Sequence, residues 1–210
     1  MPNVCGAGGY QGLVKVAVQT NGAVGQEFWF QIVPQNPHIV NTCNVLANLG
    51  RGGICTHVVT HTDGTMVDDG SLAPGLTPAH SGEVVTIWAL GLGPTNHAKT
   101  GQALTSPDPL LGGFALTAVF EIAASPGSSA PPAKLVPIEA DFAGLVQGFV
   151  GLYQINVRLP DAVPNGIQCQ RGGTLVQLFM GTIPADLPVN FWDGRVTFGN
   201  TESAGVCIVP

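Results

Sequence analysis

Glycine and proline recur so often in this chain that almost no stretch between them is long enough for a sustained helix. The 210 residues include 29 glycines and 17 prolines. Between these interruptions, apolar and polar residues alternate with a period of two, which is the pattern of a half-buried β-strand. Because 45% of the residues are hydrophobic, the chain can bury a core. These features predict a folded chain built from short strands and turns.

The clearest example of this alternation lies near the start of the chain. Residues 13–19 (LVKVAVQ) place three valines on one face, and residues 25–33 (GQEFWFQIV) place Phe28 and Phe30 together. The intervening Asn21-Gly22 favours a type I′ hairpin turn, because both of its positions require positive φ. The sequence therefore predicts a β-hairpin over 13–33.

Further alternating segments occur at 114–122 (FALTAVFEI) and 151–160 (GLYQINVRLP). Turn signals recur every 8–12 residues or so, a spacing typical of all-β sandwiches. We expect an all-β, Ig-like β-sandwich, preceded by the hairpin as a remnant of a second Ig-like unit. The expected divisions are the hairpin in 1–36, a linker and hairpin region in 37–80, and the sandwich in 81–210.

The charge pattern disfavours several classes of partner. The formal net charge is −6, and the seven lysines and arginines are scattered along the sequence. The chain therefore lacks the basic patch that nucleic acid requires. No apolar run approaches the roughly 18 residues of a membrane-spanning helix. The first residues, MPNVCGAGGY, do not have the pattern of a signal peptide, so any export signal is expected to lie upstream or to have been removed.

The glycine-rich segment 86–95 (TIWALGLGPT) follows a strand-like run, as phosphate-binding loops do. Such loops need a helix behind them, whose amide groups face the anion. The residues after Gly93 contain prolines and no helical face. We therefore interpret Gly91, Gly93 and Pro94 as a structural turn that leaves a strand of the sandwich.

Five cysteines are present, and no pair has the CxxC spacing of zinc and redox motifs. Cys43 and Cys55 flank a short glycine-rich segment, where a disulfide would stabilise the fold by roughly 3 kcal/mol. Cys169 and Cys207 form the next favoured pair. Buried free thiols remain an alternative for all of these cysteines, and no role is assigned to Cys5. Disulfides would favour an extracellular or cell-surface location.

Two motifs carry a resemblance to a known family. Residues 81–95 (SGEVVTIWALGLGPT) and 142–166 (FAGLVQGFVGLYQINVRLPDAVPNG) resemble the Solibacter-type uncharacterised C-terminal Ig-like domains, secreted modules similar to IPT/TIG domains. The matching motif residues in the second segment are Gly151, Leu152, Tyr153, Gln154 and Asn156. The resemblance is strong over about 58–166 and weaker elsewhere.

The family resemblance implies a secreted module with no established catalytic residues. The chain departs from the family pattern in its cysteines and in the stretch 170–194. We expect a non-catalytic structural or adhesive module that associates with itself or with neighbouring Ig-like modules. Addition of the N-terminal hairpin to a neighbouring subunit would build a filament. A carbohydrate-binding module is the alternative, with Trp29 and Trp192 as candidate ligand-contacting residues.

Metal sites are weaker candidates. His57, His61 and Asp63 would share one face of a strand and could hold a transition metal. Calcium is a second candidate, bound through the carboxylates of Asp63, Asp68 and Asp69, although their spacing differs from that of calcium loops. A solvent-facing polar surface and ordinary turns are the alternative interpretations.

Catalytic motifs are missing from the sequence. No GxSxG or SxxK segment occurs, and no reactive-cysteine signature is present. Glu83, Glu121 and Glu139 occur singly rather than as the paired carboxylates of a glycosidase. The sequence therefore predicts that the chain is not an enzyme and needs no cofactor.

Overall fold

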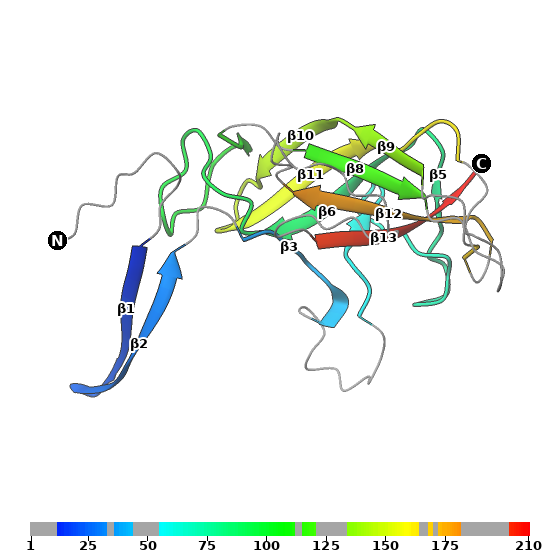
Figure 1. Ribbon diagram of the computed structural model, residues 1–210. Helices are drawn as coiled ribbons and strands as arrows, with labels where there is room; N and C mark the ends of the chain where they lie inside the picture. The colour runs from blue at the N-terminus through cyan, green and yellow to red at the C-terminus, as the bar shows by residue number, and fades with distance from the viewer. Residues whose placement is uncertain are drawn as a thin grey trace. The chain divides into compact units, whose positions relative to one another are not determined.

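The computed structural model of the chain describes residues 12–32, 36–43, 55–111, 115–120, 134–163, 168–169, 172–181 and 202–210. The chain divides into two compact units, residues 1–36 and 37–210. Every named element in the described residues is a β-strand, as Figure 1 shows. Among these residues, no helix is long and apolar enough to cross a membrane.

The first unit contains one antiparallel hairpin, formed by β1 (Gly12–Thr20) and β2 (Ala23–Ile32). Asn21 and Gly22 form the turn with φ of 50° and 83°, the left-handed conformation predicted for this pair. The register is regular from Gly12 to Ala17 and shifts between Ala17 and Gln19. The predicted hairpin is therefore confirmed, whereas its origin as a remnant of a second Ig-like unit stays a prediction.

The second unit contains two sheets. The first has the order β3-β6-β11-β10-β7, and β4 also pairs with β6. Its strands are β3 (His38–Ile39), β4 (Val59–Thr60), β6 (Val84–Leu90), β7 (Asp108–Pro109), β10 (Ala140–Leu145) and β11 (Leu152–Arg158). All of these pairings are antiparallel.

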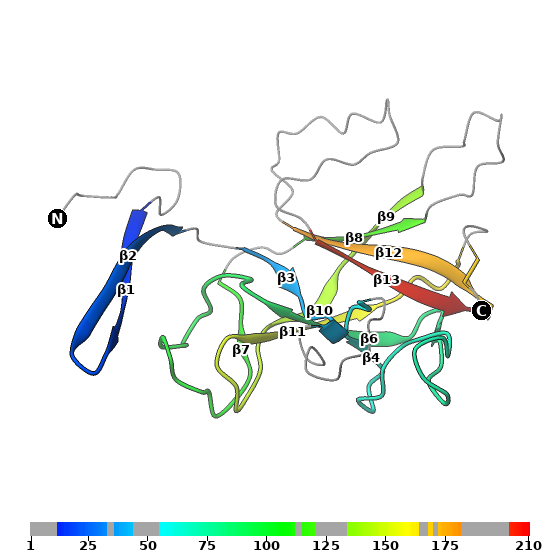
Figure 2. The same cartoon turned by 90° about the horizontal axis from the view of Figure 1, so that it is seen from below.

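The second sheet has the order β5-β13-β12-β8-β9. Its strands are β5 (Ala79–His80), β8 (Ala115–Phe120), β9 (Lys134–Ile138), β12 (Thr174–Gly181) and β13 (Glu202–Val209). Only the short β5–β13 pairing is parallel. Figure 2 shows the two sheets of this unit as separate layers.

The core lies between these layers and follows the two-residue period of the strands. In β6 and β11 the burial pattern alternates along the whole strand, so Val85, Ile87, Ile155 and Val157 are fully buried. The second sheet contributes Val176, Leu178, Met180, Ala204, Val206 and Ile208. The all-β sandwich expected from the sequence is thus the observed fold.

Residues 37–80, expected as a linker and hairpin region, supply β3, β4 and β5 to the two sheets. The chain first pairs with β6 and then crosses to pair in parallel with β13. In one sheet β6, β11 and β10 are neighbours, and in the other β13, β12 and β8 are neighbours. With the crossing of the chain from β6 to β13, this order is the strand arrangement of immunoglobulin-like sandwiches.

β3, β4 and β5 have only two residues each, which explains why alternation in the sequence did not reveal them.

Candidate functional site

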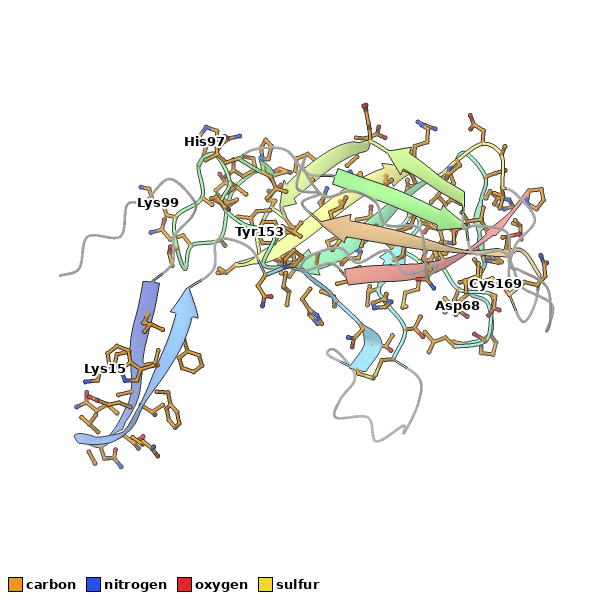
Figure 3. The ribbon with its side chains drawn as sticks, in the orientation of Figure 1. Lys15, Asp68, His97, Lys99, Tyr153 and Cys169 are labelled. Atoms are coloured by element: carbon orange, nitrogen blue, oxygen red, sulfur yellow. A yellow bond between two sulfur atoms is a disulfide. The ribbon has the colours of Figure 1, made fainter. Side chains whose placement is uncertain are left out.

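The hairpin carries most of the exposed large apolar side chains of the described residues. Of thirteen such residues, eight lie on β1 and β2: Leu13, Val14, Val16, Val18, Val24, Phe28, Trp29 and Phe30. Figure 3 shows these strands with their side chains projecting on both sides. Contiguous exposed apolar surface of this kind is typical of interaction sites. The hairpin is therefore the candidate functional site.

One side of the hairpin is apolar because its cross-strand pairs are apolar. Val14 lies opposite Phe30, and Val16 lies opposite Phe28. These four residues are called the apolar face below. They lie on the same side because each strand has a period of two and because the Asn21-Gly22 turn sets the register between the strands. Phe28 and Phe30 are 52% and 56% exposed.

The opposite side is held by contacts of Lys15. Its Nζ lies 2.5 Å from Oε1 of Glu27 and 5.9 Å from the ring centroid of Trp29. The ion pair and the cation–π contact fix this side of the hairpin, although exposed pairs of these kinds each contribute about 1 kcal/mol or less. Trp29 itself remains 63% exposed. A two-stranded sheet with such weak support is only marginally stable alone in water.

The segment 91–94, predicted to be a turn, is hydrogen-bonded to the strand that carries the second family motif. Gly91 and Gly93 have φ of 68° and 110°, so both positions favour glycine. The Tyr153 hydroxyl donates a hydrogen bond of 2.5 Å to the Gly93 carbonyl oxygen. Burial raises the pKa of this hydroxyl, which keeps its proton available for donation. The segment is thus one part of a contact that joins β11 to the end of β6.

The remaining motif residues lie on β11 beside β6. The registers place Tyr153 opposite Ala89, and Asn156 opposite Thr86. The Thr86 hydroxyl donates to Oδ1 of Asn156 at 3.1 Å. Leu152 and Gln154 lie near the start of the same strand, and Gly151, with φ of 75°, immediately precedes it. These contacts give the motif residues a structural role in the described part of the chain.

Asp108 forms a polar cluster that we did not predict. Its carboxylate accepts hydrogen bonds from the backbone amides of His97 and Ala98 and lies 2.8 Å from Nδ1 of His97. Desolvation raises the pKa of Asp108, but hydrogen bonding, including that from His97 and Ala98, outweighs this effect and brings the pKa to about 2. The sequence offered one signal, an aspartate between two prolines in a turn-rich segment.

His61 joins a network instead of the expected metal site. Its Nδ1 lies 2.5 Å from Oε1 of Glu83, and its Nε2 lies 3.2 Å from the Thr77 carbonyl oxygen. Oε2 of Glu83 also accepts a hydrogen bond from the His80 amide. Burial lowers the pKa of His61, but the hydrogen bonds to Glu83 and Thr77 and the charges of Glu83 and Asp63 outweigh it, so the pKa is raised.

The expected transition-metal set is not assembled. His57, His61 and Asp63 do not form a group whose donor atoms lie within 4.8 Å of one another. Instead, the ring of His61 contacts Glu83 and Thr77. The backbone of His57 forms an isolated β-bridge with Asn41. Asp63 accepts hydrogen bonds from the amide and hydroxyl of Thr65, which lower its pKa. The prediction assumed one strand from His57 to Asp63. The observed strand, β4, has only two residues, and the chain turns at Asp63.

The calcium candidates also have separate roles. Asp68 accepts hydrogen bonds from the Leu72 amide and the Ser71 hydroxyl, and Asp69 accepts one from the Ser71 amide. Asp63, Asp68 and Asp69 do not gather their oxygens into one group. In the described residues these aspartates therefore shape turns, and no calcium site is formed by the three together.

Both favoured cysteine pairs are disulfides in the structure. Cys43 and Cys55 are bonded with Cα atoms 5.3 Å apart, and Cys169 and Cys207 with Cα atoms 6.1 Å apart. A carboxylate oxygen of Asp69 and the sulfurs of Cys169 and Cys207 lie within 4.8 Å of one another. Because the two sulfurs are bonded to each other, neither is a thiolate that could bind a metal ion. Asp68 and Cys169 lie at the opposite end of the sandwich from His97 and Lys99 (Figure 3).

Of the two tryptophans expected to contact a carbohydrate, only Trp29 belongs to the described residues. Trp29 lies on the hairpin, whereas the indole N–H of Trp88 donates to the Thr60 hydroxyl at 3.1 Å within the sandwich. Trp192 and Cys5 lie outside the described residues, as does Glu121. The absence of catalytic activity remains a prediction.

Comparisons with protein-family models, with curated proteins and with solved structures gave no match to this chain. The resemblance to the Solibacter-type Ig-like domains therefore remains a prediction based on residues 81–95 and 142–166.

Proposed function

We propose that this chain is a non-catalytic, extracellular structural module of the Ig-like type, whose copies associate through the hairpin 12–32. The observation that carries the proposal is the apolar face of the hairpin, which combines Val14, Val16, Phe28 and Phe30 on an element of only two strands. Such an element gains stability when a further surface covers it.

The exposed area of the hairpin supports this proposal. Its eight exposed apolar side chains, on the two sides of the hairpin together, offer roughly 800 Å². One partner in a stable interface of standard size buries about that area, so a contact with one side alone would be smaller.

The two disulfides are compatible with an extracellular protein, because disulfides persist in oxidising compartments. The resemblance to secreted Ig-like domains points in the same direction. A location outside the cell and a structural or adhesive role are both parts of the proposal.

Negative-stain microscopy of the full chain tests the assembly. We expect wild-type protein to form extended particles, because a contact between two different surfaces does not close on itself unless the rotation makes a ring. The double variant Phe28→Ser/Phe30→Ser should remain as single particles. The matched control Leu111→Ser, at an exposed apolar position outside the hairpin, should assemble. Single wild-type particles at high concentration would overturn the proposal.

Carbohydrate binding is the second candidate, supported by the exposure of Trp29 beside Lys15. An exposed aromatic ring can stack on a sugar, although sugar-binding surfaces generally present more than one such ring. A glycan array compares wild-type protein with Trp29→Ala. Binding that disappears in the variant would favour this function, and equal signals for both proteins would exclude a role of Trp29 in it.

A further inference from the structure

One long strand of the sandwich has a free edge in the described part of the chain. β13 pairs with β12 from Glu202 to Ile208, but on its other side it pairs with β5 only at Ile208 and Val209. Along residues 203–207 no described strand is paired with this other side. Figure 1 shows β13, in red, at the lower edge of its sheet. These residues are called the β13 edge below.

The direction of the backbone groups on this edge follows from one hydrogen bond. The Ser81 amide donates to the Val209 carbonyl oxygen at 2.9 Å, so the backbone of Val209 faces the β5 side. Backbone groups alternate direction along a strand, and the β12–β13 register is continuous. The amide and carbonyl groups of Ser203, Gly205 and Cys207 therefore face the same side as those of Val209, beyond the point where β5 ends.

The other sheet edges in the described residues are less suited to receiving a strand. β9 contains Pro137, which has no amide hydrogen to donate. β7 is two residues long and includes Pro109, while β3 and β4 are also two residues long. The part of β10 that β7 leaves uncovered is short and carries a register shift between Ala140 and Phe142. Short edge strands and edge prolines are common protections against unwanted pairing. Among the described residues the β13 edge has neither protection, although β3 of the other sheet comes close to β13.

The hairpin has the properties of a strand donor. β1 and β2 span nine and ten residues without proline, and each retains one edge that is not used in the hairpin pairing. On β13, Ala204, Val206 and Ile208 face the core, so the inner surface of the sheet is apolar with period two. The apolar face of a hairpin placed beside β13 would extend this inner surface, and its main-chain groups would pair with Ser203, Gly205 and Cys207.

We propose that the hairpin 12–32 of one copy adds to the β13 edge of a second copy and extends its five-stranded sheet. This inference rests on the proposed function, because it names the surface that receives the hairpin. The hairpin and the β13 edge are different surfaces, so each copy both donates and receives. Contacts of this kind connect copies head to tail.

Hydrogen exchange of the intact wild-type chain tests the inference without any substitution. Amides of 203–207 and of 12–32 are compared between dilute and concentrated protein by mass spectrometry. We expect exchange in both segments to slow on the order of tenfold or more as copies associate. Assembly with protection of 12–32 but not of 203–207 would overturn the β13 acceptor while the proposed function stood.

Two further outcomes are distinct. Protection of 203–207 that does not change on dilution would show that the segment is covered within one chain, and it would overturn addition between copies. Failure to assemble at any concentration would overturn the proposed function together with this inference.

A proline on the receiving edge provides the second test. Ser203→Pro removes an amide hydrogen that faces away from β12, so the β12–β13 pairing keeps its hydrogen bonds. We expect assembly to weaken at least tenfold in midpoint concentration, whereas the matched control Ser203→Ala should assemble like wild type. Circular dichroism and melting of the dilute proteins establish that both fold. A folded Ser203→Pro protein that assembles normally would overturn the proposal.

Discussion

Asp108 is a buried acid that organises the loop between β6 and β7. Its side chain is only 4% exposed, and its carboxylate collects two backbone amides and the His97 ring. Its depressed pKa means that the folded state favours the charged carboxylate. The stability that this group contributes is therefore present above the usual aspartate pKa of about 3.8 and is lost as the pH falls toward about 2.

Asp108→Asn should lower the melting temperature by several degrees at neutral pH, because the amide group cannot accept hydrogen bonds as the carboxylate does. The difference between wild type and variant should shrink as the pH falls from about 4 to about 2. Thermal melting of both proteins over this pH range measures the difference in melting temperature. Asp141→Asn, at an exposed position, is the control and should melt like wild type.

His61 gives a pH dependence of opposite sign. Its raised pKa means that the folded state favours the protonated ring, which can donate to both Glu83 and Thr77. This contribution is complete below the unfolded-state pKa of about 6.5 and is lost as the pH rises through the raised folded-state value.

His61→Gln should therefore destabilise the protein more at about pH 5.5 than at about pH 8.5. Urea unfolding at both values gives the two differences in free energy of unfolding. His80→Asn is the control, because the contact of His80 with Glu83 uses the backbone amide. A difference that grew with pH would show that the ring is neutral in the folded protein.

At the scale of single residues, sequence patterns located turns better than polar networks. Asn21-Gly22 was placed correctly because positive φ is a local requirement, and Gly91 and Gly93 also have positive φ. The His61–Glu83 contact spans 22 residues and the His97–Asp108 contact spans 11. Contacts between residues so far apart in the sequence depend on how the strands are paired, and local sequence patterns do not specify that pairing.

β11 is the best example of prediction at the scale of elements. It alternates clearly in the sequence and, like β6, it buries every second residue. By contrast, β3, β4, β5 and β7 have two residues each, too few for any period to appear. The interpretation of 37–80 as a linker followed from this lack of signal.

The hydrogen bond between Tyr153 and Gly93 stabilises the pairing of these elements at one end. Tyr153→Phe keeps the buried ring but removes the hydroxyl, which should lower the free energy of unfolding by about 1 kcal/mol. Urea unfolding measures this change. The substitution also leaves the Gly93 carbonyl oxygen without this donor, which adds to the expected loss of stability. An unchanged free energy of unfolding would therefore show that the hydrogen bond contributes nothing to stability.

At the scale of the whole molecule, the two disulfides close loops of different length. The sequence separation is 12 for Cys43–Cys55 and 38 for Cys169–Cys207. In the loop-entropy model, removal of the Cys169–Cys207 disulfide should lower the free energy of unfolding by about 4 kcal/mol, and removal of the Cys43–Cys55 disulfide by about 3 kcal/mol.

Denaturant unfolding of Cys169→Ser/Cys207→Ser and of Cys43→Ser/Cys55→Ser compares the two contributions. We expect the first pair to be the more destabilising, also because Cys207 lies in β13 and fastens the C-terminal strand to the loop before β12. The opposite order would show that native contacts, rather than loop length, determine these contributions.

The sandwich class and the N-terminal hairpin could be predicted because both depend on local alternation and turns. The sequence could not show that both sides of the hairpin are exposed, or that no other described strand pairs with β13 along 203–207. Those properties follow from the neighbours of each strand in space, as the two-residue overlap of β5 with β13 illustrates.

Sedimentation velocity of the intact chain over a wide concentration range is the most direct test of assembly through the hairpin. For wild-type protein we expect the mean sedimentation coefficient to rise continuously with concentration, because head-to-tail contacts leave a free donor and a free acceptor at every stage. Phe28→Ser/Phe30→Ser should sediment as a monomer throughout. A wild-type protein that stays monomeric at the highest concentration, or a double variant that assembles equally well, would contradict the account.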